Sequence, residues 1–308
     1  MGKIISIGWD VGGWRGNKNA FCILSFDDEL EAYKKIRIEK FHLANHNELF
    51  KVDGSYPDFL EDWITNSKHD KIIFAIDAPL GFPTKFKELI SGKKYNGTDG
   101  NEYKSYAFRE TDIIINEGKQ TLSPTFTYLT NNVTVALNMR MLLEEDGKNF
   151  MTIPFEGDDS SERKIIEVYP GIFKDSAYEK LLLDMINYFG KSSLFDGDIG
   201  SYLIEENQNK SHTQSIIEKI ECIRNDYLLK YYCSHSDEPK SYYERYADLG
   251  DAFICALIGM CFELNGKEGF PKIEKEWREV IKRRNVKAEK IQGTKGDGEG
   301  WIYYPKVE

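Results

Sequence analysis

Four aspartates occupy positions from which they can act together. Asp10 and Asp77 each directly follow a short apolar run. Asp248 and Asp251 are three residues apart, a spacing that places both side chains on one face of a helix. Carboxylates crowded into one cleft repel one another and stay ionised together only when a cation is present. The four residues therefore predict a metal-binding site.

The donor atoms of this set indicate which metal it would hold. Oxygen ligands alone select hard cations, so Mg²⁺ or Mn²⁺ is expected rather than zinc. Two such ions can stabilise the attacking and leaving oxygens of a phosphoryl displacement. The histidines show no ligand spacing, and His42 and His46 are interpreted as structural. A phosphoryl displacement assisted by such ions is therefore chemistry that this set of residues could support.

Short apolar segments must position the first two aspartates. Residues 3–9, 20–26 and 34–42 are expected to form three antiparallel strands. Residues 47–66 show helical spacing, and the run 72–76 that follows is predicted to be a buried strand parallel to the first. The aspartates after the two parallel strands would then meet at their carboxyl ends, where open α/β sheets bind ligands.

The rest of the chain is predicted to be mainly helical. Residues 83–149 show a helical pattern with a polar loop inside it, and 164–168 form another short strand. Residues 243–264 are predicted to form one long helix, which Asn265-Gly266 ends. Without the other two aspartates, Asp248 and Asp251 would be interpreted as ordinary helix surface.

The domain organisation follows from the polar segment 171–240. It is rich in Asn, Lys, Glu and Tyr and is predicted to be a helical cap inserted beside the acidic cleft. We find no repeat and no low-complexity linker, so residues 1–308 are predicted to form one elaborated domain.

Composition narrows the class of partner. Lys and Arg total 41 against 51 Asp and Glu, a net charge of −10, which counts against a broad nucleic-acid-binding surface. A nucleic-acid substrate is therefore expected to be short, structured or held by a local basic patch. The candidate patches are Lys85/Lys87/Lys93/Lys94 and Lys282/Arg283/Arg284/Lys287. Scattered cysteines and the lack of a membrane-spanning run or signal peptide indicate a cytoplasmic protein.

Several strings along the chain resemble a known family. GWDVGG, IDAPLGFP, FRETD, EVYP, DLGDAFICAL and GWIYYP resemble the domain-of-unknown-function family 429, predicted ribonuclease H-like nucleases. The order also resembles Holliday-junction resolvases, in which a first-strand Asp, a fourth-strand acid and a D-x-x-D helix bind two metals. The resemblance implies a ribonuclease H-like fold with a mixed five-stranded sheet, flanking helices and a helical insertion. By the same resemblance Asp10, Asp77, Asp248 and Asp251 would be the ligands.

This chain departs from the resemblance at two of those positions. The family string on the last helix is D-A-x-D-A, whereas this chain has DLGDA, and we favour Asp251 over Asp248 as the ligand. The fourth-strand acid is Asp77 where the resolvases carry a glutamate. A shorter side chain there can change metal spacing or substrate class.

The resemblance also adds three candidate substrate contacts. Arg109 and Asp112 are expected on a helix over 103–116, where the Arg109 guanidinium can bind a phosphate through two hydrogen bonds. A surface ion pair between the two is the alternative. Glu167 ends the strand 164–168 and is either a second acid near the site or a strand-edge residue.

Three functions compete. The leading hypothesis is a metal-dependent phosphodiesterase acting on RNA, branched DNA or a small nucleotide, with catalysis by Asp10, Asp77 and Asp251. Sugar kinases and actin-like ATPases also begin with a strand and a G-x-D-x-G-G loop, but they need a duplicated fold. A non-catalytic binding protein is the third alternative, suggested by the acidic composition and the tyrosine-rich insertion.

Overall fold

The structure is a computed structural model of the chain. It describes residues 3–12, 19–27, 36–51, 55–65, 69–93, 106–109, 112, 123–125, 127–145, 149–153, 161–171, 246–265, 288–290 and 302–305. The predicted cap over 171–240 lies outside the described residues, apart from Gly171, and stays a prediction.

The chain begins with three antiparallel strands. They are β1 (Ile4–Asp10), β2 (Asn19–Phe26) and β3 (Ile36–Ala44). Strand β2 pairs with both neighbours, and its register with β3 shifts between Ile23 and Leu24. The first two strands are almost entirely buried because their apolar side chains fill both faces of the sheet. The three antiparallel strands expected from sequence are confirmed.

Parallel strands extend the sheet on the other side of β1. Strand β4 (Lys71–Asp77) is parallel to β1. Strand β6 (Arg163–Val168) is parallel to β4, and β8 (Ile302–Pro305) is parallel to β6. Two short strands, β5 (Met151–Thr152) and β7 (Ala288–Lys290), pair with β6 and β8. The described residues thus form one mixed sheet of eight strands, with the main order β3-β2-β1-β4-β6-β8-β7.

The predicted number of five strands was too small. Strands β5, β7 and β8 span two, three and four residues, respectively. Segments this short contain too few residues to show an alternating apolar pattern. The parallel pairing of β1 with β4, which the prediction of the site required, is confirmed.

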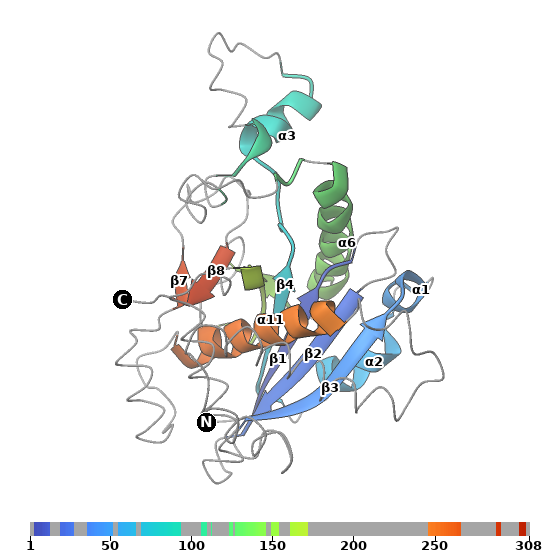
Figure 1. The fold of residues 1–308 in the computed structure, drawn as a ribbon, viewed down its shortest axis with the longest axis vertical. Helices are drawn as coiled ribbons and strands as arrows, with labels where there is room; N and C mark the ends of the chain where they lie inside the picture. Colours follow the sequence, from blue (N-terminus) through green and yellow to red (C-terminus); the bar gives the residue numbers. More distant parts are fainter. Residues whose placement is uncertain are drawn as a thin grey trace, which may run out of the picture.

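Helices cover both faces of this sheet (Figure 1). The described helices are α1 (His46–Leu49), α2 (Asp58–Thr65), α3 (Thr84–Ile90), α6 (Thr127–Glu144) and α11 (Tyr246–Asn265). Helix α11 is the long helix predicted over 243–264, and it crosses the face opposite to α2 and α6. Within the described segments, every helix is too short or too polar to span a lipid bilayer.

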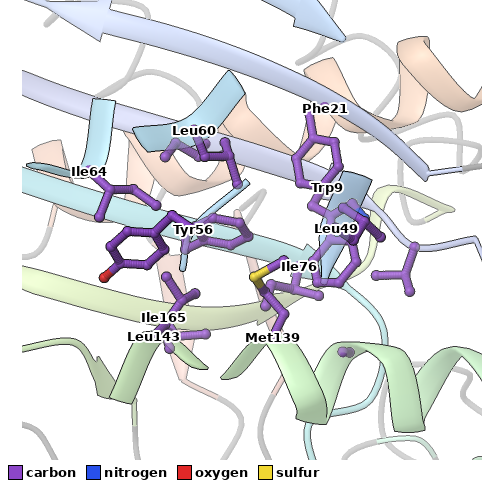
Figure 2. Close-up of a cluster of buried hydrophobic side chains, with 14 of the residues drawn as sticks. Trp9, Phe21, Leu49, Tyr56, Leu60, Ile64, Ile76, Met139, Leu143 and Ile165 are labelled. Atoms are coloured by element: carbon purple, nitrogen blue, oxygen red, sulfur yellow. The ribbon is translucent and has the colours of Figure 1, made fainter. Parts of the chain in front are cut away.

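A large apolar core fills the space between the sheet and helices α2 and α6 (Figure 2). Alternate residues of β1 and β4 point into it, including Trp9 and Phe74. Phe21 of β2 stacks on Trp9 with ring centroids 5.3 Å apart. From the helices come Leu60 and Met139, both fully buried. Burial of each such side chain contributes roughly 1.5–3 kcal/mol, so this face anchors the sheet.

The opposite face of β1 is built for close approach by α11. A Cβ atom added at Gly8 would overlap the carbonyl oxygen of Ala252 and the amide nitrogen of Ala256. The hydroxyl of Ser6 donates to the carbonyl oxygen of Ala256 at 2.7 Å. One turn later, Gly259 lies against Ser6. Helix α11 therefore runs against the direction of β1, with its first turns at the carboxyl end of the strand.

Buried ion pairs fix the other end of α11. Glu263 is 2% exposed and pairs with both Lys71 of β4 and Lys164 of β6. Removal of one partner from a buried pair typically costs about 3–5 kcal/mol because the remaining charge is left uncompensated. These contacts set the position of α11 along the strands.

Substitution of Gly8 tests this packing. We expect Gly8→Ala to lower the free energy of unfolding by about 3 kcal/mol or more, because the methyl group meets helix backbone that cannot give way. Gly92→Ala is the matched control: φ at Gly92 is 84°, and no described atom lies within 4 Å of the added Cβ. Its cost should be about 1–2 kcal/mol, from the backbone conformation alone. Equal losses in urea unfolding would contradict the close packing.

Candidate functional site

Asp10 and Asp77 stand side by side at the carboxyl ends of two parallel strands. They are the last residues of β1 and β4, and the parallel register pairs them directly. Side chains alternate between the faces of a strand, so Asp10 shares its face with Ser6 and Gly8. Asp77 shares its face with Ala75, which lies close to α11. Both carboxylates therefore lie on the α11 side of the sheet.

Helix α11 carries the other two aspartates toward this edge. Asp251 directly precedes Ala252, whose carbonyl group lies against Gly8. Asp248 is four residues before Ala252, one turn nearer to the beginning of the helix. Because α11 runs against β1, this turn lies toward the strand end that carries Asp10. Asp248 and Asp251 are both half-buried.

Three of the four carboxylates influence one buried thiol, that of Cys255. Burial raises the pKa of Cys255 well above its usual value, and the charges of Asp77, Asp10 and Asp251 raise it further. The three carboxylates thus act on the same buried group. Sequence reasoning missed Cys255. Its position four residues after Asp251, on the same helix face, was the available signal.

Tyr169 is a second neighbour that sequence reasoning did not assign to the site. It directly follows β6. Burial raises the pKa of its phenol, and the charge of Asp77 raises it further. The string EVYP contains this residue, but its spacing alone gave no reason to assign it a role.

Two amide side chains hold the backbone that follows β1. The side-chain oxygen of Asn19 accepts hydrogen bonds from the Gly12 amide at 3.0 Å and from the Trp9 indole at 3.1 Å. The amide group of Asn132, on α6, donates to the carbonyl oxygen of Val11 at 2.8 Å. These contacts hold the backbone of residues 11 and 12, directly after β1.

The four aspartates form one directly paired set, Asp10 and Asp77, with Asp248 and Asp251 on the helix that packs beside it. Among the described residues, no three His, Cys, Asp or Glu side chains are placed to hold a metal ion together. Mg²⁺ is commonly held by one or two carboxylates, while water and substrate phosphates complete its octahedron. The Asp10–Asp77 pair fits this type of oxygen site.

Arg109, Asp112 and Glu167 form a separate buried network. They are 0%, 3% and 2% exposed, respectively. The Arg109 guanidinium donates to both oxygens of Glu167 at 2.7 and 2.6 Å, and to both oxygens of Asp112 at 3.0 and 2.7 Å. The Arg109–Asp112 ion pair of the alternative interpretation is present, but it is buried and not at the surface. Of the predicted helix over 103–116, the structure describes five residues: Tyr106, Ala107 and Asp112 are helical, whereas Phe108 and Arg109 are not.

The network faces away from the paired aspartates. The Lys164 side chain lies on the α11 face of β6, because its ammonium group pairs with Glu263 of α11. Glu167 is three residues later and therefore lies on the opposite face, together with Ile165 of the core. Burial alone would lower the pKa of Arg109, but the charges of Glu167 and Asp112 outweigh it and keep the guanidinium charged. Burial raises the pKa of Glu167, against the opposing effect of Arg109. The guanidinium is already engaged by two carboxylates, and its predicted contact with substrate stays a prediction.

Crowding of the acidic residues predicts how Asp251→Asn behaves. Without metal, this variant should be more stable than the parent by on the order of 1 kcal/mol, because less repulsion is stored in the folded state. Millimolar Mn²⁺ should stabilise the parent more than the variant, so the difference in stability between the two proteins becomes smaller or changes sign. Thermal melts in chelator and in Mn²⁺ measure both effects.

Asp62→Asn is the control for this experiment, since Asp62 is exposed on α2. It should show neither the gain in chelator nor a changed response to Mn²⁺. If Asp251→Asn melts below the parent in chelator and both proteins ignore Mn²⁺, then Asp251 is a structural helix residue.

Comparison of the chain with protein-family models, with curated proteins and with solved structures finds no match. The resemblance to the family of unknown function therefore stays a prediction. What the site does must be inferred from its own residues.

Proposed function

We propose that this protein is a metal-dependent phosphodiesterase with a ribonuclease H-like fold, acting on a nucleic acid or nucleotide. The observation that carries the proposal is the direct pairing of Asp10 with Asp77 at the carboxyl ends of β1 and β4. Helix α11 lies on the same face and carries Asp251, whose charge acts on the same thiol as the other two.

The order of these acids along the fold supports the proposal. Asp10 ends the first strand, Asp77 ends the fourth, and the D-x-x-D pair lies on a later helix packed on the same sheet. This is the arrangement that the resemblance to the resolvases implies. The three antiparallel strands followed by parallel β4 and β6, within a mixed sheet of eight strands, also support the proposal.

The residues fit a hard divalent cation. The carboxylates of Asp10 and Asp77 would hold it, with Asp251 and Asp248 as further candidates, and all four supply only oxygen donors. When bound, one or two such ions supply a nucleophile at neutral pH and stabilise the charge of the leaving oxygen. The chain contributes fixed carboxylates, and α11 covers one side of the pair.

Charge explains why binding of the substrate should depend on the cation. A phosphodiester is an anion, and two adjacent carboxylates would repel it without a compensating charge. Two lysines of the first candidate basic patch are already paired with an acid. Lys85 and Lys93 both pair with Glu88, at 3.3 and 3.2 Å. We therefore propose a short or structured substrate rather than a long duplex held along a basic surface.

Loss of either paired aspartate should abolish the activity. We expect Asp10→Asn and Asp77→Asn to lower phosphodiesterase activity by about 100-fold or more, because metal-assisted stabilisation of the transition state is worth several kcal/mol. The assay uses Mn²⁺ with labelled single-stranded RNA, branched DNA and a small nucleotide diester. Asp62→Asn should keep the parent rate. No cleavage of any substrate by the parent, or full activity of both variants, would overturn the proposal.

A further inference from the structure

Glu167 lies beside the end of β4 without sharing the face of Asp77. In the parallel register it is opposite Ile76, the residue before Asp77. Its side chain lies on the core side of the sheet, whereas Asp77 faces α11. The backbone after β4 is therefore a route by which Glu167 can act on the position of Asp77.

A buried hydrogen bond provides that route. Oε2 of Glu167 accepts from the Leu80 amide at 2.9 Å. Leu80 is three residues after Asp77, and Pro79 between them has a fixed φ. The Leu80 side chain is 1% exposed in the apolar core. The exit of β4 is thus held at one residue by both its side chain and its backbone.

Arg109 holds Glu167 in place for this contact. A buried carboxylate is costly unless it is paired and hydrogen-bonded, and the guanidinium supplies both through two parallel hydrogen bonds. Asp112 orients the same guanidinium from its other side. The contacts form a continuous path from Asp112 through Arg109 and Glu167 to the loop after Asp77.

We propose that Glu167 is a positioning residue, which fixes the exit of β4 and so holds Asp77 opposite Asp10. The inference rests on the proposed function, because the purpose it assigns to this rigidity is cation binding by Asp77. Partners that orient the ligands of a metal site commonly change metal affinity by about 10- to 100-fold when they are replaced. Asp112 is expected to contribute less, because its contacts with Arg109 act on the loop after Asp77 only through Arg109 and Glu167.

Glu167→Gln and Asp112→Asn form a matched pair of variants. Glu167 accepts hydrogen bonds from the Leu80 amide and from two guanidinium nitrogens of Arg109. Asp112 accepts from the backbone amide and from two guanidinium nitrogens of Arg109. The side chain of Gln has a single acceptor oxygen, so it cannot accept hydrogen bonds from the Leu80 amide and from both guanidinium nitrogens of Arg109 together. Each variant leaves one carboxylate paired with Arg109, so the cost to the ion network is similar.

Two measurements read the effect. The first is hydrogen exchange of the peptide covering residues 77–82 without metal, where Glu167→Gln should expose the Leu80 amide to exchange about tenfold faster than Asp112→Asn does. The second is the Kd for Mn²⁺ by calorimetry, which should rise about tenfold or more in Glu167→Gln and clearly less in Asp112→Asn. Both are compared after correction for the global stability of each variant.

The outcomes separate this inference from the proposed function. Equal exchange and equal Mn²⁺ affinity in the two variants would overturn the positioning role. If the parent binds no Mn²⁺, the proposed function fails, and the exchange of Leu80 alone decides whether Glu167 fixes the strand exit. Should Glu167→Gln not fold, Glu167→Asp replaces it, because its shorter side chain keeps the charge but cannot reach both Arg109 and Leu80. The same two results are expected from it.

Discussion

The contact between Gly8 and the backbone of α11 is the constraint on which the rest of the site depends. A side chain at Gly8 would meet Ala252 and Ala256, so only glycine lets the helix lie this close to β1. The hydrogen bond from Ser6 to Ala256 fixes the same approach. Because α11 runs against β1, this closeness brings the turn with Asp251 to the strand end where Asp10 stands.

Crowding acidic groups works against stability, and other parts of the fold compensate for it. The core beneath β1 and β4 is continuous and almost fully buried, so the strands cannot separate to relieve the repulsion. Glu263 ties the far end of α11 to Lys71 and Lys164. The backbone after each strand is also held, by Asn19 after β1 and by Glu167 after β4. Such rigidity suits a site whose ligands must stay close before a cation arrives.

Much of this arrangement follows from local sequence patterns. The apolar runs predicted β1, β2, β4 and β6, and a helix between two strands predicted that β1 and β4 are parallel, which places Asp10 opposite Asp77. The helical pattern over residues 243–264 predicted α11. The role of Glu167 could not be predicted, because it depends on which face of β6 meets the core. The burial of Arg109 could not be predicted either, because it depends on a contact with Glu167, 58 positions further along the chain. Spacing along the chain gives no sign of this contact.

The central claim is that the carboxylates of Asp10 and Asp77 together hold a divalent cation. The most direct measurement is anomalous X-ray diffraction from a crystal of the protein soaked in Mn²⁺. The account predicts an anomalous peak between these two carboxylates, bound by oxygen atoms on the α11 side of the sheet. A fully occupied Mn²⁺ at another place, or no peak while the two side chains point into separate environments, would contradict it.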